Sequence, residues 1–194
     1  MGRLGQTPSQ TLGPYFSLRL GAEGENLLAG PDAPGKRIQV AGMVLDGDRR
    51  PIEDALIEVW QANAAGRYRH PDDNRTEIAL DDGFNGFGRA LTDFETGDYV
   101  IETVKPGPVP DPEGELQAPH LNLIIQARGM LNPSFTRVYF SDEEEANRAD
   151  LVLGMVPAER RHTLIAKCGK PGDPQQYRFD IRFQGDDETV FFEF

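Results

Sequence analysis

The stretch that decides the fold is Gln117-Ala-Pro-His-Leu-Asn-Leu-Ile-Ile-Gln126. After its proline, polar and aliphatic residues alternate, with His120 and Asn122 on one side and aliphatic residues on the other. Alternation with a period of two is typical of a β-strand whose two faces meet different surroundings. His120 and Asn122 therefore project from the same face of one strand. Two histidines at this spacing would indicate a metal site. The asparagine at the second position is therefore the residue that needs an explanation.

Working outward, many short segments show the same alternation and are separated by turn residues. We expect strands over residues 37–45, 55–60, 89–93, 99–104, 121–127, 136–140, 163–167, 177–183 and 189–194. Turn sequences between 89–93 and 99–104, and between 177–183 and 189–194, predict two hairpins. Short strands without alternating helices predict an all-β fold, a two-sheet β-sandwich.

Two short helical segments are expected besides the strands. Ser141 is suited to cap a helix, with Glu144 three residues later completing a capping box. A second helical turn is predicted to begin at Pro157, since proline fits the first position of a helix.

The first 36 residues are rich in glycine, proline, serine and threonine and show no sustained period. We predict an extended N-terminal arm over 1–36 and a sandwich domain over 37–194. Within the arm, Thr11-Leu-Gly-Pro-Tyr-Phe16 places two aromatic residues beside a Gly-Pro bend. The arm either packs on its own domain or reaches a partner chain. Two long segments without strand patterns, 61–88 and 105–119, are expected to be functional loops.

Charge and composition exclude several classes of function. With 20 Lys and Arg against 32 Asp and Glu, the 194-residue chain carries a net charge of −12. This charge disfavours binding to nucleic acid or to an anionic membrane. No apolar run is long enough for a transmembrane span, and the N-terminus lacks the apolar core of a secretory signal. The single cysteine, Cys168, fits a reducing compartment, so we expect a cytoplasmic protein.

Three histidines are the candidate ligands or bases. His162 lies in a polar segment and is expected at the surface, while His70 stands among arginines in Arg67-Tyr-Arg-His-Pro-Asp72. His120 begins an apolar strand, where a hydrogen-bonded core histidine is the more common occurrence. No nucleophile elbow, phosphate-binding loop, dinucleotide fingerprint or zinc-finger spacing occurs in the sequence.

Several motifs in this order resemble those of the intradiol ring-cleaving dioxygenases, which have a prealbumin-like sandwich fold. The motifs are Trp60-Gln-Ala-Asn63, Gly66-Arg-Tyr-Arg-His70, Gly86-Phe-Gly-Arg89, Lys105-Pro-Gly-Pro108, Pro119-His120 and Tyr177-Arg-Phe-Asp-Ile181. The arm motif and the terminus Glu188-Thr-Val-Phe-Phe-Glu-Phe194 narrow the resemblance to the protocatechuate 3,4-dioxygenases. Each motif alone is weak, but their combination over most of the chain is specific.

The resemblance implies a ferric iron held by two tyrosinates and two histidines. Phenolate oxygens stabilise Fe(III), and imidazole also suits iron. In this sequence the four ligand positions fall on Tyr68, Val109, His120 and Asn122, and that of a catalytic arginine falls on Gln117. Valine has no metal-binding atom, and a neutral amide is a poor substitute for imidazole. We therefore expect a vestigial iron site that binds no metal.

Such a pattern resembles the α chain of a heteromeric enzyme, in which the partner β subunit holds the Fe(III). The resemblance implies that Thr11, Gly13, Pro14 and Tyr15 line the partner's substrate pocket, where protocatechuate reacts with O2. It also suggests Arg137 as the residue that binds the substrate carboxylate, because a guanidinium can hold a carboxylate bidentately.

Arg128, beside Gly129 at a predicted strand end, is the competing candidate for that carboxylate. A salt bridge at a strand end would explain Arg137 without any role in substrate binding.

Two further hypotheses remain open on sequence alone. One is a metal-free sandwich that binds or carries small aromatic compounds without a catalytic partner. The other is a self-sufficient homomeric enzyme with unusual ligands, against which Val109 argues.

Overall fold

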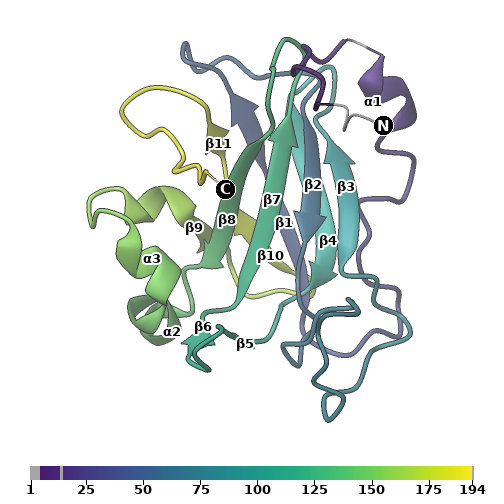
Figure 1. The fold of residues 1–194 in the computed structure, drawn as a ribbon, viewed down its shortest axis with the longest axis vertical. Helices are drawn as coiled ribbons and strands as arrows, with labels where there is room; N and C mark the ends of the chain where they lie inside the picture. Colours follow the sequence, from purple (N-terminus) through teal and green to yellow (C-terminus); the bar gives the residue numbers. More distant parts are fainter. Residues whose placement is uncertain (1–4, 14, 194) are drawn as a thin grey trace.

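The structure is a computed structural model that describes residues 5–13 and 15–193, so Pro14 lies outside the described residues. Its strands form two packed layers, seen one in front of the other in Figure 1. The strands are β1 Arg37–Leu45, β2 Leu56–Trp60, β3 Phe87–Leu91, β4 Asp98–Val104, β5 Val109–Pro110, β6 Leu116–Gln117, β7 His120–Gln126, β8 Ser134–Phe140, β9 Ile165–Cys168, β10 Gln175–Arg178 and β11 Ile181–Arg182.

One layer has the order β3-β2-β7-β8 and is antiparallel throughout. In the other layer β1 lies between β4 and the pair β10 and β11, and β9 pairs with β10. A short parallel pairing between β8 and β9 joins the two layers along one edge. The prediction of an all-β sandwich is confirmed.

The core lies between the layers and follows the alternation of the sequence. Ile38, Val40 and Val44 of β1 face Leu121 and other aliphatic residues of β7, and all are at most 1% exposed. Burying each such side chain contributes about 1.5–3 kcal/mol. The opposite face of β7 is thereby left for His120 and the polar residues that follow it.

Both predicted hairpins are wrong. β3 pairs with β2 and β4 pairs with β1, so the turn after Asp93 carries the chain from one layer to the other. At the C-terminus, Thr189 donates one backbone hydrogen bond to Arg182, and Phe192 then pairs with Phe135 in the other layer. Turn residues indicate a change of direction, but which strands pair is decided by how the two apolar faces meet.

The predicted strand over 177–183 is divided into β10 and β11, both parallel to β1. At the interruption, the side chain of Asp180 accepts a hydrogen bond from the backbone nitrogen of Met43 at 3.0 Å. A side-chain carboxylate thus takes the place of a backbone carbonyl in the hydrogen-bond ladder along β1.

The helices are short: α1 Phe16–Arg19, α2 Glu144–Ala149, α3 Leu151–Met155 and a 3-10 helix over Arg161–Leu164. The predicted cap by Ser141 is wrong, because its hydroxyl accepts from the nitrogen of Cys168 and α2 begins after Glu143 without a side-chain cap. Instead Asp150 caps α3 by accepting from Leu153. The predicted turn at Pro157 is present and leads into the 3-10 helix. None of the described helices has the length and apolar character needed to cross a bilayer.

The N-terminal segment returns to its own domain. The backbone of Leu12 exchanges hydrogen bonds with Gly129 and Met130, in the turn between β7 and β8. Farther along, Leu28 is 1% exposed and belongs to the main core. That the first part of this segment also packs on a partner chain stays a prediction.

Candidate functional site

A row of side chains crosses three strands on the outer face of the sheet. Trp60 of β2 lies opposite Asn122 of β7, which lies opposite Arg137 of β8. Directly opposed residues of antiparallel strands project from the same face, so these three side chains are neighbours. His120 stands two residues before Asn122 on that face and is 3% exposed.

The two long loops, residues 61–86 and 105–119, reach this end of the sheet, where β5 and β6 lie (Figure 1). Together with the strands they form a cavity of about 450 Å³. Val109 pairs with Gln117 across β5 and β6, which places both at the cavity wall. The cavity is lined among others by Trp60, Tyr68, Val109, Gln117, His120 and Arg137.

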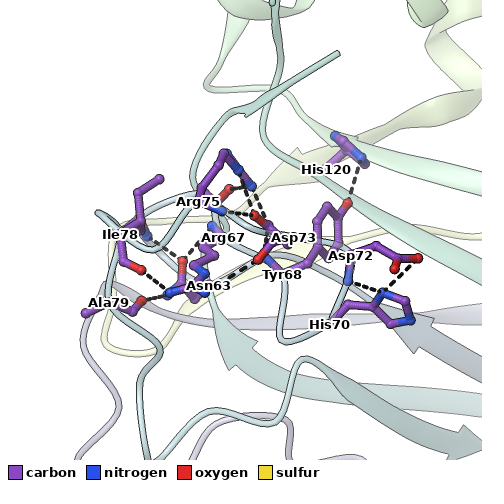
Figure 2. Close-up of polar contacts among 12 residues, drawn as sticks. Asn63, Arg67, Tyr68, His70, Asp72, Asp73, Arg75, Ile78, Ala79 and His120 are labelled. Carbon is purple, nitrogen blue, oxygen red and sulfur yellow. Dashed lines mark hydrogen bonds and ion pairs between the residues drawn. The ribbon is translucent and has the colours of Figure 1, made fainter. Parts of the chain in front are cut away.

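Three of the four vestigial positions are in direct contact. The hydroxyl of Tyr68 lies 3.5 Å from Nε2 of His120, toward which it points in Figure 2. The amide Nδ2 of Asn122 donates to the same hydroxyl at 3.2 Å and to the carbonyl of Trp60 at 3.3 Å. The fourth position, Val109, lines the same cavity. Positions far apart in sequence are thus brought together as the motifs implied.

His120 is held as a neutral imidazole. Its Nδ1 lies 2.7 Å from the carbonyl oxygen of Ala118, so Nδ1 carries the proton and Nε2 is an acceptor. Burial, together with the positive charge of Arg137, lowers the pKa of His120 to about 4. Burial also raises the pKa of the Tyr68 phenol above its usual value, so at neutral pH the pair is uncharged.

The residues of this cavity do not fit a ferric ion. Tyr68 and His120 offer one phenol and one imidazole, whereas Val109 supplies no donor atom and the amide nitrogen of Asn122 faces the phenol. Fe(III) bound by intradiol-type ligands requires two anionic phenolates and two imidazoles, and a neutral amide does not replace one of them. This chain's side chains therefore do not assemble that metal site.

An internal network fixes the loop that carries Tyr68 (Figure 2). Asp73 forms a salt bridge with Arg75 at 2.5 Å and accepts from the backbone nitrogen of Tyr68 at 2.8 Å. The hydrogen bonds from Arg75 lower the pKa of Asp73 to about 2. Asn63, just after β2, accepts from Arg67 and donates to Ala79. Asp73 and Arg75 were not predicted, although their spacing of two residues within a loop is compatible with a local ion pair.

Arg137 belongs to this cavity and not to the arm. Its Nη1 donates to Oε1 of Gln117 at 2.8 Å and contacts the hydroxyl of Tyr139 at 3.5 Å. That hydroxyl donates to Asp150, which also accepts from the backbone nitrogens of Ala118 and Leu153. Asp150 was not predicted, yet it connects β8, α3 and the segment just before β7.

The first part of the arm, up to α1, lies at the opposite end of the strands (Figure 1). Thr11 and Gly13 are exposed, and Tyr15 is 77% exposed. Arg128 directly precedes Gly129 and Met130, to which the backbone of Leu12 is hydrogen-bonded. Its Nε lies 3.0 Å from Oδ2 of the buried Asp54. Its side chain is nevertheless 60% exposed. The arm residues are therefore brought together with Arg128, whereas Arg137 is distant from them.

The other histidines lie outside the central row. His162 is exposed beside Asp187, as expected, and the half-exposed His70 accepts from the backbone nitrogen of Asp72.

Comparison with known proteins agrees with this geometry. A family model described as "Dioxygenase" matches residues 12–185. The protocatechuate 3,4-dioxygenase alpha chain of Burkholderia cepacia is 46% identical over 204 residues, covering 100% of both chains. The beta chain of that organism's enzyme is 33% identical over 171 residues, covering 85% of this chain and 72% of its own.

Among solved structures, the dioxygenase domain of a dioxygenase carbohydrate-binding protein fusion from Streptomyces sp. SirexAA-E has a TM-score of 0.60 at 25% identity. The match covers 91% of this chain and 96% of that one. Sequence similarity, sheet topology and the residues gathered around the cavity agree. The chain belongs to the intradiol dioxygenase family.

Proposed function

We propose that this chain is the α subunit of a heteromeric protocatechuate 3,4-dioxygenase, acting in the cytoplasm. The enzyme cleaves protocatechuate between its two hydroxylated carbons with O2, giving 3-carboxy-cis,cis-muconate. In this proposal the Fe(III) is held by the partner β subunit, and this chain contributes to the wall of its substrate pocket.

One observation supports the proposal: the positions that the resemblance assigns to the family's iron ligands lie together, but their side chains do not form that ligand set. Tyr68, Asn122 and His120 remain in contact, yet two of the four ligand positions hold residues that do not bind Fe(III). Similarity over the full length to an alpha chain, together with the weaker similarity to a beta chain, supports a division of labour between two related chains.

The arm and Arg128 are the parts proposed to meet the partner's substrate. Thr11, Gly13 and Tyr15 are exposed, as is most of the Arg128 side chain, at the same end of the sandwich. Asp54 holds only one edge of the guanidinium, through Nε, and is its one partner within the described part of the chain. This placement supports Arg128, rather than Arg137, as the ligand of the substrate carboxylate.

The first test compares the chain expressed alone with the chain coexpressed with a β subunit. We expect iron, the visible tyrosinate-to-iron absorption and oxygen uptake on protocatechuate only after coexpression and copurification. Stoichiometric iron in the chain alone, or failure to copurify, would contradict the proposal.

The second test concerns the two arginines in the coexpressed complex. A charge-assisted hydrogen bond contributes about 1.5–3 kcal/mol, so Arg128→Gln should raise KM for protocatechuate roughly 10- to 100-fold. Arg137→Gln should leave KM within about twofold, because its side chain lies in this chain's own cavity. The reverse result would assign the substrate carboxylate to Arg137.

A further inference from the structure

The cavity around Tyr68 and His120 holds a cation whose charge is not neutralised. Arg137 is partly buried, and its one short hydrogen bond goes to the neutral side chain of Gln117. Among the described residues, Nε and Nη2 of Arg137 have no partner. The other arginine at the wall, Arg75, is already paired with Asp73. A guanidinium with free donors beside a cavity favours an anion, and most strongly a carboxylate.

The rest of the cavity is suited to a flat, apolar ligand body. The indole of Trp60 stacks on the ring of Tyr68, with centroids 5.7 Å apart and planes at 9°. Val109 and Pro110 line the same space. The volume of about 450 Å³ lies within the range of small-molecule sites, roughly 300–1,000 Å³.

At the deep side, the phenol and the imidazole provide neutral polar groups. Their contact is long, at 3.5 Å, and Nε2 of His120 is an acceptor that no shorter hydrogen bond satisfies among the described residues. A ligand hydroxyl could therefore donate to Nε2.

Asn122 and Tyr139 are the neighbours of Arg137 on the strands beside it. Asp150 accepts from the Tyr139 hydroxyl and Asp72 lines the cavity, but no carboxylate among the described residues forms an ion pair with Arg137.

We propose that this cavity is a metal-free binding site for a small aromatic carboxylate, with Arg137 holding the carboxylate and the ring lying against Trp60. The site is built wholly from side chains of this chain. The inference therefore does not depend on the proposed function.

Trp60 supplies a direct measurement, since it is the chain's single tryptophan. We would titrate the full chain with 4-hydroxybenzoate and follow tryptophan emission. Saturable quenching is expected, and Arg137→Gln should weaken the affinity at least about tenfold. Arg137→Lys should recover part of the loss. Arg148→Gln on the exposed face of α2 is the matched control and should change nothing.

Ligand chemistry separates charge recognition from unspecific apolar binding. The neutral analogue 4-hydroxybenzamide should bind at least about tenfold more weakly than 4-hydroxybenzoate, and acetate should bind more weakly still. Equal affinity of acid and amide, or quenching that Arg137→Gln leaves unchanged, would overturn the proposal.

The same question can be asked in the coexpressed complex under anaerobic conditions. Equilibrium dialysis with labelled 4-hydroxybenzoate measures the total number of bound molecules per αβ pair. A titration of the visible iron absorption measures how many of them bind near the iron. The total should exceed the number near the iron by one. Arg137→Gln should abolish only that additional site. Equal counts in the wild-type complex would contradict the inference, while failure to obtain an iron-bearing complex would contradict only the proposed function.

Discussion

At the scale of single residues, His120 shows how a buried histidine is held by hydrogen bonding and packing. It donates through Nδ1 to Ala118 and packs against the ring of Tyr139, with centroids 5.9 Å apart. A buried imidazole that stays neutral is a structural group, and its uncharged state is itself part of the folding free energy.

The pH dependence of stability tests this role of His120. Its pKa falls from 6.5 in the unfolded chain to about 4 in the folded one, so the unfolded state binds more protons between these values. Stability contributed by the neutral imidazole is present above pH 6.5 and is lost as the pH falls towards 4, by about 3 kcal/mol in total. The deficit in unfolding free energy of His120→Gln relative to wild type should therefore shrink over this range.

Urea denaturation at pH 7, 5.5 and 4.5 measures the effect. Val138→Ala in the main core provides the control, because it removes no titratable group and its deficit should stay nearly constant over this range. A constant deficit for His120→Gln across the range would contradict a neutral buried imidazole.

At the scale of elements, the two long loops depend on close approach of their backbones. Gly66 has φ of 84°, and a Cβ at this position would lie 2.1 Å from the carbonyl oxygen of Pro108. A Cβ added at Gly107 would likewise lie 2.6 Å from backbone atoms of the other loop. The glycines of the two motifs are therefore explained by the contact between loops that carry Tyr68 and Val109.

Replacing Gly66 by alanine should separate these loops. The left-handed conformation alone costs roughly 1–2 kcal/mol for a residue with a Cβ, and the clash with backbone adds to it, so we expect a loss of about 2–4 kcal/mol. Thermal or urea unfolding measures the loss, and weaker binding in the cavity should accompany it.

Gly114→Ala is the matched control, because Gly114 has φ of 94° but no atom within 4 Å of its Cβ position. Gly114→Ala should lower the free energy of unfolding only by the cost of the left-handed conformation, about 1–2 kcal/mol. Equal losses for the two variants would show that the loop contact contributes nothing.

At the scale of the whole molecule, the two proposed binding regions lie at opposite ends of the strands of the sandwich (Figure 1). The arm and Arg128 lie at one end, where β7 turns into β8. The cavity with Arg137 lies at the other, where β7 begins. The two regions share no residue, so we expect them to bind their ligands independently.

Independence of the two ends is measurable in the coexpressed complex. The variant Arg128→Gln/Arg137→Gln should combine the raised KM of the first substitution with the weakened 4-hydroxybenzoate binding of the second. Distant sites usually add within about 0.3–0.5 kcal/mol, so each effect should match that of the single variant within about twofold. A larger departure, in steady-state kinetics or dialysis, would indicate coupling through the sandwich.

Much of the fold followed from local patterns. The bounds of β1 agree with the predicted strand, and β7 agrees within one residue, because period-two alternation reports directly which side chains face the core. The hairpins and the Ser141 cap failed, since strand pairing and the partner of a hydroxyl depend on residues distant in sequence.

The β-sandwich and the family could be predicted from the sequence, as could the proposal that Val109 and Asn122 occupy two of the family's iron-ligand positions. These depend only on residue identity and spacing. Only the tertiary structure decided which side chains share a space: Arg137 joined Tyr68 and His120, while Arg128 joined the arm. The physical reason is that a strand's alternation fixes the face of each side chain, whereas pairing with other strands and the folding of long loops fix its neighbours.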